Sequence, residues 1–129
     1  MGYCTLYGDM IGAIAPIGDL TKTQVINLSL YINQNNTIIP TQIITREPSA
    51  ELAPNQKDQD NLPPYDQLDQ AIEENLLIKQ QRSSFEQSIA ATIKKQEHKR
   101  SQSPIAIRLS TSSFNIDRQY PISYHQEVF

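Results

Sequence analysis

The sequence predicts an α/β fold that is dominated by helices and contains only short strands. Three segments, near residues 21–36, 64–76 and 83–100, carry apolar residues at helical spacing. Two apolar segments, residues 11–17 and 105–109, have the length of short strands. The hydrophobic fraction of the 129 residues is 38%, below the roughly 45–50% of an average globular domain, so we expect a small core.

The first predicted helix has a clear start. Thr21 and Gln24 have capping-box spacing, in which a hydroxyl is followed three residues later by a side-chain amide. Val25, Leu28 and Ile32 fall on one helical face, which we expect to be buried. The polar residues 33–36 should end this helix.

A strand and a long loop are predicted next. Residues 38–45 are rich in β-branched side chains but contain Pro40, which is typical of a strand or an extended edge segment. Residues 46–64 are mostly polar and contain four prolines. Loops of nearly twenty residues in compact domains are usually functional or disordered.

Two further helices complete the predicted fold. Each shows an apolar stripe, and the second begins at Ser83 or Ser84 with capping-box spacing to Glu86 or Gln87 and runs into the basic residues 94–100. The first stripe consists of Tyr65, Leu68, Ile72 and Leu76, and the second of Phe85, Ile89 and Ile93.

Composition excludes several classes of function. The formal net charge is −3, so no basic excess favours nucleic-acid binding. Cys4 is the single cysteine, which makes an intramolecular disulfide impossible and fits a reducing compartment. We find neither a signal-peptide pattern nor a run of eighteen apolar residues, so we expect a cytoplasmic protein without a membrane partner.

Three blocks of sequence are distinctive. The first is residues 2–10 (GYCTLYGDM), followed by Pro16 and residues 19–23 (DLTKT). The second comprises residues 43–52 (IITREPSAEL), 54–60 (PNQKDQD) and 62–66 (LPPYD). A weaker third block is residues 97–100 (EHKR) with residues 117–122 (DRQYPI) behind it.

Together, in this order, the blocks resemble the synthetase half of glutamine-dependent NAD synthetases. The resemblance implies that residues 1–129 are the C-terminal part of an adenine-nucleotide alpha-hydrolase-like, Rossmann-like synthetase domain. It implies a mobile loop at about residues 46–64 and an irregular tail at residues 101–129.

The resemblance also implies a reaction. The family is an ATP-dependent carbon–nitrogen ligase that amidates deamido-NAD to NAD through an adenylate, with ammonia from glutamine and with Mg²⁺ assisting the phosphates. The ligands implied are ATP and deamido-NAD. The family resemblance also implies a homo-oligomer, and a separate chain could carry the N-terminal part of the enzyme.

Site residues follow from the matched positions. Thr5, Lys22 and Ser49 resemble the positions near ATP, and His98 and Lys99 resemble the pair that holds deamido-NAD. Asp58 and Asp60 lie in the loop that closes over the reacting phosphates. No catalytic residue and no metal ligand is assigned within these residues.

The sequence departs from the family pattern at several points. The phosphate-gripping Ser-Gly-Gly-x-Asp-Ser motif and the family's metal-binding glutamate are absent, so we expect a truncated chain that is inactive alone. Ala53 stands where the family has arginine, and Ser101 also departs from the family pattern. Leu6 and Ala13 stand where the ammonia-only branch has ligands, which favours the glutamine-dependent branch.

The residues by themselves leave simpler roles open. Lys22 could be a solvated surface lysine, and Lys99 could be a helix-end cation that complements the macrodipole. Asp58 and Asp60 could be solvating loop charges, and Ser49 could cap a turn. At the level of the whole chain, the alternatives are a non-catalytic nucleotide-binding or interaction module and a remnant of a decayed gene.

Overall fold

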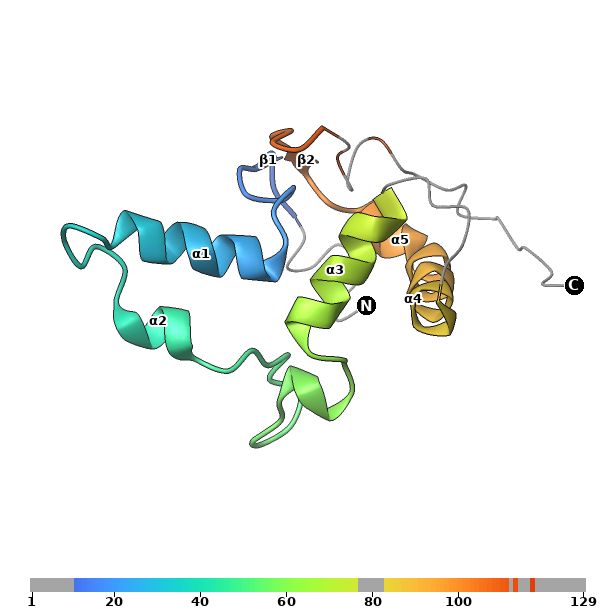
Figure 1. The fold of residues 1–129 in the computed structure, drawn as a ribbon, viewed down its shortest axis with the longest axis horizontal. Helices are drawn as coiled ribbons and strands as arrows, with labels where there is room; N and C mark the ends of the chain where they lie inside the picture. The colour runs from blue at the N-terminus through green and yellow to red at the C-terminus, as the bar shows by residue number, and fades with distance from the viewer. Residues whose placement is uncertain (1–10, 77–82, 112, 114–116, 118–129) are drawn as a thin grey trace, which may run out of the picture. The chain divides into compact units, whose positions relative to one another are not determined.

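The computed structural model describes residues 11–76, 83–111, 113 and 117 (Figure 1). The chain divides into two compact units, one formed by residues 1–19 and 71–129 and the other by residues 20–70. The described residues form five α-helices, one short 3-10 helix and one two-stranded sheet. The predicted dominance of helices over short strands is therefore confirmed.

The sheet joins two segments that are far apart in the sequence. Strand β1 (Ile14–Ala15) pairs in parallel with strand β2 (Ile105–Ala106), with Ile14 opposite Ile105 and Ala15 opposite Ala106 (Figure 1). Both strands lie inside the predicted segments 11–17 and 105–109, but each has two residues. The strand β2 lies within the predicted tail, at the segment where the sequence predicted a short strand.

A tight turn follows β1. The Gly18 N–H donates a 3.1 Å hydrogen bond to the Ala15 carbonyl. A Cβ atom at residue 18 would lie 3.0 Å from the Cβ of Ala15 and 3.1 Å from the Cβ of Ala106. A side chain at residue 18 would therefore press on the paired alanines of the sheet, and these would have to move by a few tenths of an ångström.

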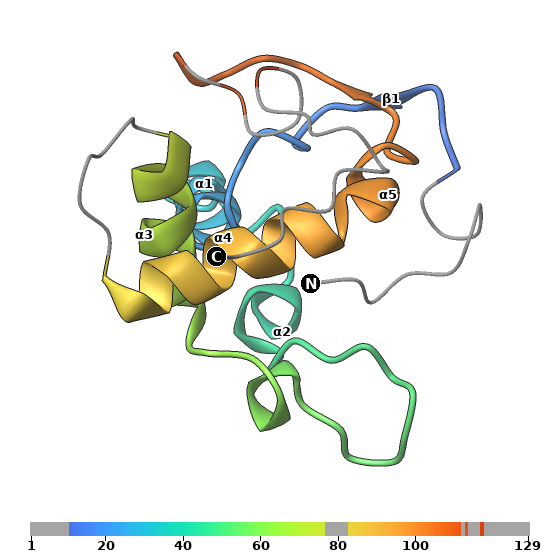
Figure 2. The same cartoon turned by 90° about the vertical axis from the view of Figure 1, so that its right-hand side faces the viewer.

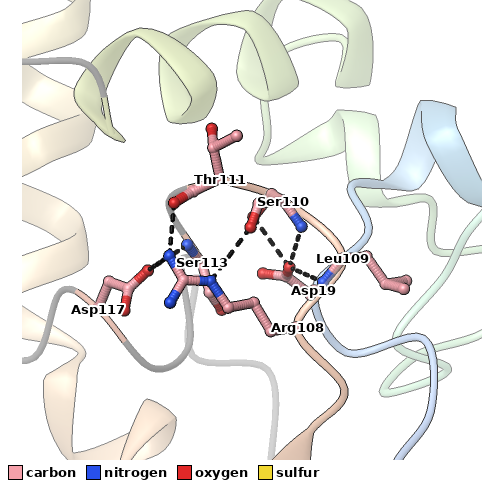
Figure 3. A network of polar contacts seen from close by, with 7 residues as sticks. All are labelled: Asp19, Arg108, Leu109, Ser110, Thr111, Ser113 and Asp117. Atoms are coloured by element: carbon pink, nitrogen blue, oxygen red, sulfur yellow. Dashed lines mark hydrogen bonds and ion pairs between the residues drawn. The ribbon is translucent and has the colours of Figure 1, made fainter.

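The carboxylate of Asp19 continues the pairing of the two segments beyond the strands. Asp19 is 7% exposed, and its Oδ2 accepts hydrogen bonds from Leu109 N at 2.8 Å, Ser110 N at 2.9 Å and Ser110 Oγ at 2.9 Å (Figure 3). Asp19 and Ser110 are 91 residues apart, which is also the separation of the paired residues Ile14 and Ile105. The side chain thus preserves the register of the sheet where backbone pairing has stopped.

Arg108 organises the segment that Asp19 holds. Its Nε donates to the Ser110 carbonyl at 3.2 Å, and its Nη2 donates to the Thr111 carbonyl. Nη2 also lies 3.0 Å from Oδ2 of Asp117, which accepts a 2.8 Å bond from the Ser113 N–H (Figure 3). Carbonyl and carboxylate groups after β2 are therefore gathered around one guanidinium.

Helix α1 (Lys22–Ile32) confirms the predicted helix but not its buried face. The Thr21 N–H donates to Oε1 of Gln24 at 2.9 Å, as the capping box requires. No residue of α1 is buried, and Leu28 and Ile32 are each 40% exposed. The prediction that Val25, Leu28 and Ile32 form core was wrong, because Val25 is only half-buried and the other two are exposed.

The predicted strand over residues 38–45 was wrong. Residues Thr41–Thr45 form helix α2, and Pro40 precedes it with φ of −54°. Asn33 Oδ1 accepts hydrogen bonds from the N–H groups of Ile38 and Ile39, at 3.0 and 2.9 Å. These bonds use the donors that a strand would need, so local turn chemistry overrides the β-branched composition. Figure 1 shows the resulting turn between α1 and α2.

The remaining helices carry most of the small core. Helix α3 (Tyr65–Leu76) buries Leu68 and Ala71, while Tyr65 and Ile72 are half-buried. Helix α4 (Ser84–Lys95) buries Ile89 but leaves Phe85 38% exposed. Beyond the helices, Leu62 and Ala106 are also buried.

The third predicted helix is divided. Ser83 and Glu86 form the expected capping box at its start, with Ser83 Oγ accepting from Glu86 N at 3.2 Å. The helix α4 ends at Lys95, and the short helix α5 (Glu97–Arg100) follows Gln96 (Figure 2). Gln96, with φ of −100° and ψ of 16°, lies outside helical geometry and separates the two.

Many large apolar side chains are exposed in both units. In the described part of the chain they include Ile11, Ile14, Ile17, Leu30, Tyr31, Ile38, Ile43, Leu52, Ile105, Ile107 and Leu109. None of the described helices is long and apolar enough to cross a membrane. The exposure is typical of surfaces that other protein segments cover.

The Asp19 network predicts a dependence on pH. Burial raises the pKa of Asp19, but hydrogen bonds from the Ser113 side chain, the Leu109 and Ser110 N–H groups and the Ser110 hydroxyl outweigh burial and lower it to about 2 from 3.8. The stabilisation is therefore complete above pH 3.8 and is lost as the pH falls through about 2. Asp19→Asn should remove about 2 kcal/mol of protection at pH 7 and flatten this dependence. The protection and its pH dependence can be measured by amide hydrogen exchange at Leu109 and Ser110, corrected for the pH dependence of the intrinsic exchange rates.

The exposed Asp66 provides the matched control, because Asp66→Asn makes the same charge change on another element. It should leave exchange at both amides unchanged. Equal loss of protection in the two variants would contradict the role given to Asp19.

Candidate functional site

The start of α1 is the first candidate site. Lys22 is the first residue of the helix and is exposed. The next residue, Thr23, donates from its backbone N and its Oγ1 to Oδ2 of Asp69, at 2.8 and 2.6 Å. An internal carboxylate therefore occupies part of the helix N-terminus, and the lysine beside it is the exposed group that can meet an outside anion.

A hollow in the predicted loop is the second candidate site. Its volume is about 650 Å³, and it lies within one unit. Arg46 and Ser49 bring a guanidinium and a hydroxyl to its lining, which also contains acidic and amide side chains. The lining residues are Arg46, Ser49, Glu51, Leu52, Ala53, Pro54, Asn55 and Gln56.

The wall of this hollow is shaped by two left-handed residues, Glu51 with φ of 54° and Asn55 with φ of 58°. Such a conformation is costly for glutamate, so surrounding contacts must hold it. Ser49 Oγ accepts from the Glu51 N–H at 3.0 Å, and the Leu52 N–H donates to Oε1 of Gln56 at 2.9 Å. Both bonds are local to the loop, and the first of them orients the Ser49 hydroxyl.

The loop is closed at its base by a backbone contact. The Asp58 N–H donates to the Pro48 carbonyl at 2.9 Å. Ion pairs Arg46–Glu51 and Lys57–Glu47 add contacts on its surface, where both partners are more than half exposed. Glu47 raises the pKa of Lys57 by hydrogen bonding and by its charge.

The donors at the hollow suit an anionic ligand. The Ser49 hydroxyl accepts one bond from Glu51 and can still donate to a phosphate or ribose oxygen. Arg46 is a site residue that sequence reasoning missed, although it precedes Ser49 by only three positions. Its guanidinium could contact a phosphate, but an incoming anion would compete with Glu51 for it.

The two loop aspartates have different surroundings. Asp58 is 8% exposed, its Oδ2 accepts from the Tyr65 hydroxyl, and its Oδ1 is buried without a hydrogen-bond partner. A solvating role for Asp58 is therefore wrong. Asp60 is exposed, and its Oδ2 accepts from the Lys57 N–H at 2.8 Å, so it caps the 3-10 helix Asp58–Asp60.

No metal centre is formed by the described residues, because no three His, Cys, Asp or Glu side chains gather there. Asp58 and Asp60 each bond to groups nearby in the chain instead. No chemical step through Mg²⁺ is therefore assigned to the described side chains.

The basic pair His98 and Lys99 lies on α5, and both side chains are half-buried. Next to them, Oε2 of Glu97 lies 2.8 Å from Nη1 of Arg100, with the Glu97 side chain 2% exposed and the Arg100 side chain 14% exposed. Sequence reasoning missed this buried ion pair, because four polar residues in a row, three of them charged, indicate a solvated helix end. Because both residues belong to α5, the pair stabilises the conformation of the turn that carries His98 and Lys99.

The structure distributes the predicted residues over two units. Lys22, Ser49, Asp58 and Asp60 belong to residues 20–70, and they lie on three different elements of that unit: α1, the loop and the 3-10 helix. His98 and Lys99 belong to the other unit. Thr5, predicted near ATP, lies outside the described residues.

The family model and the similar curated proteins carry related descriptions. A family model described as NAD synthase matches residues 1–103. A glutamine-dependent NAD(+) synthetase of Acinetobacter baylyi is 40% identical over 133 residues, which cover 95% of this chain and 25% of that protein. Proteins of the same description from Synechocystis sp. and Aquifex aeolicus are 41% and 42% identical and cover 95% of this chain.

A solved structure is also similar in sequence. It is a glutamine-dependent NAD+ synthetase from Acinetobacter baumannii in complex with ADP, 33% identical, with a TM-score of 0.37. The match covers 94% of this chain and 22% of that chain. The chain thus spans about a quarter of the length of the curated relatives that it matches.

The buried pair on α5 predicts a large effect of one substitution. Arg100→Ala should lower the free energy of unfolding by about 3 kcal/mol, because it leaves the Glu97 carboxylate buried without its counter-charge. Arg46→Ala breaks an ion pair in which the side chains are 73% and 67% exposed, and should cost at most about 1 kcal/mol. Urea unfolding followed by circular dichroism gives the free energy of unfolding of both variants. Equal losses in the two would contradict the greater stabilisation assigned to the buried pair.

Proposed function

Because the chain belongs to the NAD synthase family, we propose that it supplies part of the active site of an enzyme that amidates deamido-NAD to NAD. The observation that carries this proposal is the extent of the family match. Residues 1–103 include every position assigned to a ligand, from Thr5 to Lys99. The relatives that cover most of this chain are described as glutamine-dependent NAD(+) synthetases.

The proposed reaction has two steps. The nicotinate carboxylate of deamido-NAD attacks the α-phosphorus of ATP, which forms an acyl adenylate and releases pyrophosphate. Ammonia then attacks the acyl carbon, and AMP leaves to give NAD. Negative charge moves onto pyrophosphate in the first step and onto AMP in the second. Positioned cations and hydrogen-bond donors are therefore the main catalytic requirement.

The proposed ATP contacts are Thr5, Lys22 and Ser49. Lys22 is exposed at the start of α1, where an ammonium can meet a phosphate. Ser49 has a hydroxyl on the wall of the 650 Å³ hollow, beside Arg46. For Lys22 and Ser49, these features suit groups that bind a triphosphate and its ribose, and they support the assignment of these two residues beside the family match.

His98 and Lys99 are the proposed contacts for deamido-NAD. Both lie on α5, whose single turn is stabilised internally by the Glu97–Arg100 pair. Deamido-NAD carries a carboxylate and a pyrophosphate, and a basic pair held on a fixed turn suits such an anion. The half-burial of both side chains limits the conformations they lose on binding.

The rest of the catalytic machinery is proposed to come from other polypeptide. The phosphate-gripping Ser-Gly-Gly-x-Asp-Ser motif does not occur in these residues. The exposed apolar side chains, such as Ile14 and Ile105 on the sheet, favour association with further protein surface. We propose that this surface belongs to the remainder of a synthetase, with its amidase as the source of ammonia, and that the 129 residues alone make no NAD.

One alternative function is favoured by the same exposed residues. A non-catalytic module could bind a nucleotide at the hollow and a protein partner at the apolar surface. The two proposals differ in one outcome, because only the first requires NAD formation when the missing polypeptide is supplied. ATP binding by the 129 residues without NAD formation in the assembled system would favour the module.

Co-expression tests the proposed function. The chain should be expressed with the reading frame that precedes its gene and assayed for NAD from deamido-NAD, ATP and glutamine. We expect NAD formation that requires both polypeptides. In the assembly, Lys22→Ala should weaken ATP binding by about tenfold or more, because a charge-assisted hydrogen bond to phosphate contributes roughly 1.5–3 kcal/mol.

Lys95→Ala is the matched control. Lys95 is an exposed lysine at the end of α4, in the other unit, and its substitution removes the same charge as Lys22→Ala. Its ATP affinity should equal that of the unsubstituted assembly. Unchanged affinity in Lys22→Ala, or no NAD formation in a purified complex, would overturn the assignment.

A further inference from the structure

A carboxylate from a distant helix closes the start of α1. Oδ2 of Asp69, on α3, accepts from both the backbone N and the Oγ1 of Thr23, 46 residues earlier, at 2.8 and 2.6 Å. Asp69 is 5% exposed. The contact is favoured because the first turn of a helix has N–H groups without intrahelical partners and carries partial positive charge.

This contact stands out because apolar packing on α1 is limited, with Val25 and Ile26 only half-buried. No residue of α1 is buried, so its start lacks the core contacts that usually set a helix in place. The capping box between Thr21 and Gln24 is local and orders only the first turn. The two bonds from Thr23 to Asp69 instead tie that turn to α3, which buries Leu68 and Asp69.

Lys22 directly precedes Thr23, so its backbone is fixed by the same two bonds. An ammonium on a long flexible side chain binds phosphate weakly unless its backbone is held, because ordering the chain costs conformational entropy. We propose that Asp69 is a positioning residue for ATP binding, which holds the start of α1 so that Lys22 faces the phosphates. This inference rests on the proposed function of Lys22.

Asp69 could also have the opposite effect on ATP binding, with an outcome that a measurement can distinguish. A carboxylate at a helix N-terminus could instead compete with phosphate for the same N–H groups. Removing its charge would then tighten ATP binding. A positioning residue predicts weaker binding, so the sign of one measurement separates the two.

Isothermal titration of ATP into the co-expressed assembly provides the test. Asp69→Asn should raise the dissociation constant for ATP by about threefold to tenfold, because an amide oxygen is a weaker acceptor for Thr23 and carries no charge for the helix N-terminus. Asp66→Asn, an exposed substitution with the same charge change on the same helix, should stay within about twofold of the unsubstituted assembly. Unchanged or tighter binding in Asp69→Asn would overturn the proposal.

A second pair of variants reports on the contact itself. Thr23→Ser keeps the hydroxyl that donates to Asp69, whereas Thr23→Val removes it with little change of shape. We expect Thr23→Ser to bind ATP normally and Thr23→Val to weaken it in the same direction as Asp69→Asn. Faster amide exchange at Thr23 should accompany both damaging variants, in the 129-residue chain as well as in the assembly. Equal ATP affinities of Ser and Val variants would count against a role for this bond.

Failure of the inference and failure of the proposed function are distinguishable. If Lys22→Ala weakens ATP binding and Asp69→Asn does not, Asp69 has no positioning role while the ATP assignment stands. If Lys22→Ala has no effect, the ATP assignment fails and the positioning role fails with it, whatever amide exchange shows at Thr23.

Discussion

The buried carboxylate of Asp19 joins the two segments of the chain that make up one of the compact units. The sheet between β1 and β2 has only two residues in each strand, which is too little backbone pairing to join segments 91 residues apart. Asp19 adds three hydrogen bonds in the same register, and Gly18 allows the turn before it to pack against Ala106. Without this network, the segment after β2 would lose its attachment to the segment after β1.

Buried carboxylates with polar partners occur at other points of the chain as well. Asp69 holds the start of α1, Asp58 accepts from Tyr65 at the end of the loop, and Glu97 pairs with Arg100 on α5. Each of these carboxylates is buried, and each accepts hydrogen bonds or faces a guanidinium. With few apolar side chains inside, charge-assisted polar contacts carry much of the order, and they raise the cost of losing a partner.

This construction has consequences for the proposed chemistry. The residues assigned to ligands, such as Lys22, Ser49 and Lys99, lie at the ends of helices or in the loop. The groups that hold them are buried acids or backbone atoms close by in space. Ligand contacts are thus separated from supporting contacts, which allows a substitution in a supporting residue to change affinity without touching the ligand.

Local patterns in the sequence determined the helix starts at Thr21 and Ser83, because the hydroxyl and the acidic or amide side chain of a capping box lie within four residues. The two strand segments and the family were also predictable, since apolar length and motif order are local properties. The strand expected at residues 38–45 failed because Asn33 captures the backbone donors of Ile38 and Ile39. Only the tertiary structure decided which carboxylates are buried and what they bind. The partners of Asp19 and Asp69 lie 46 to 91 residues away, a distance over which single-residue propensities carry no information.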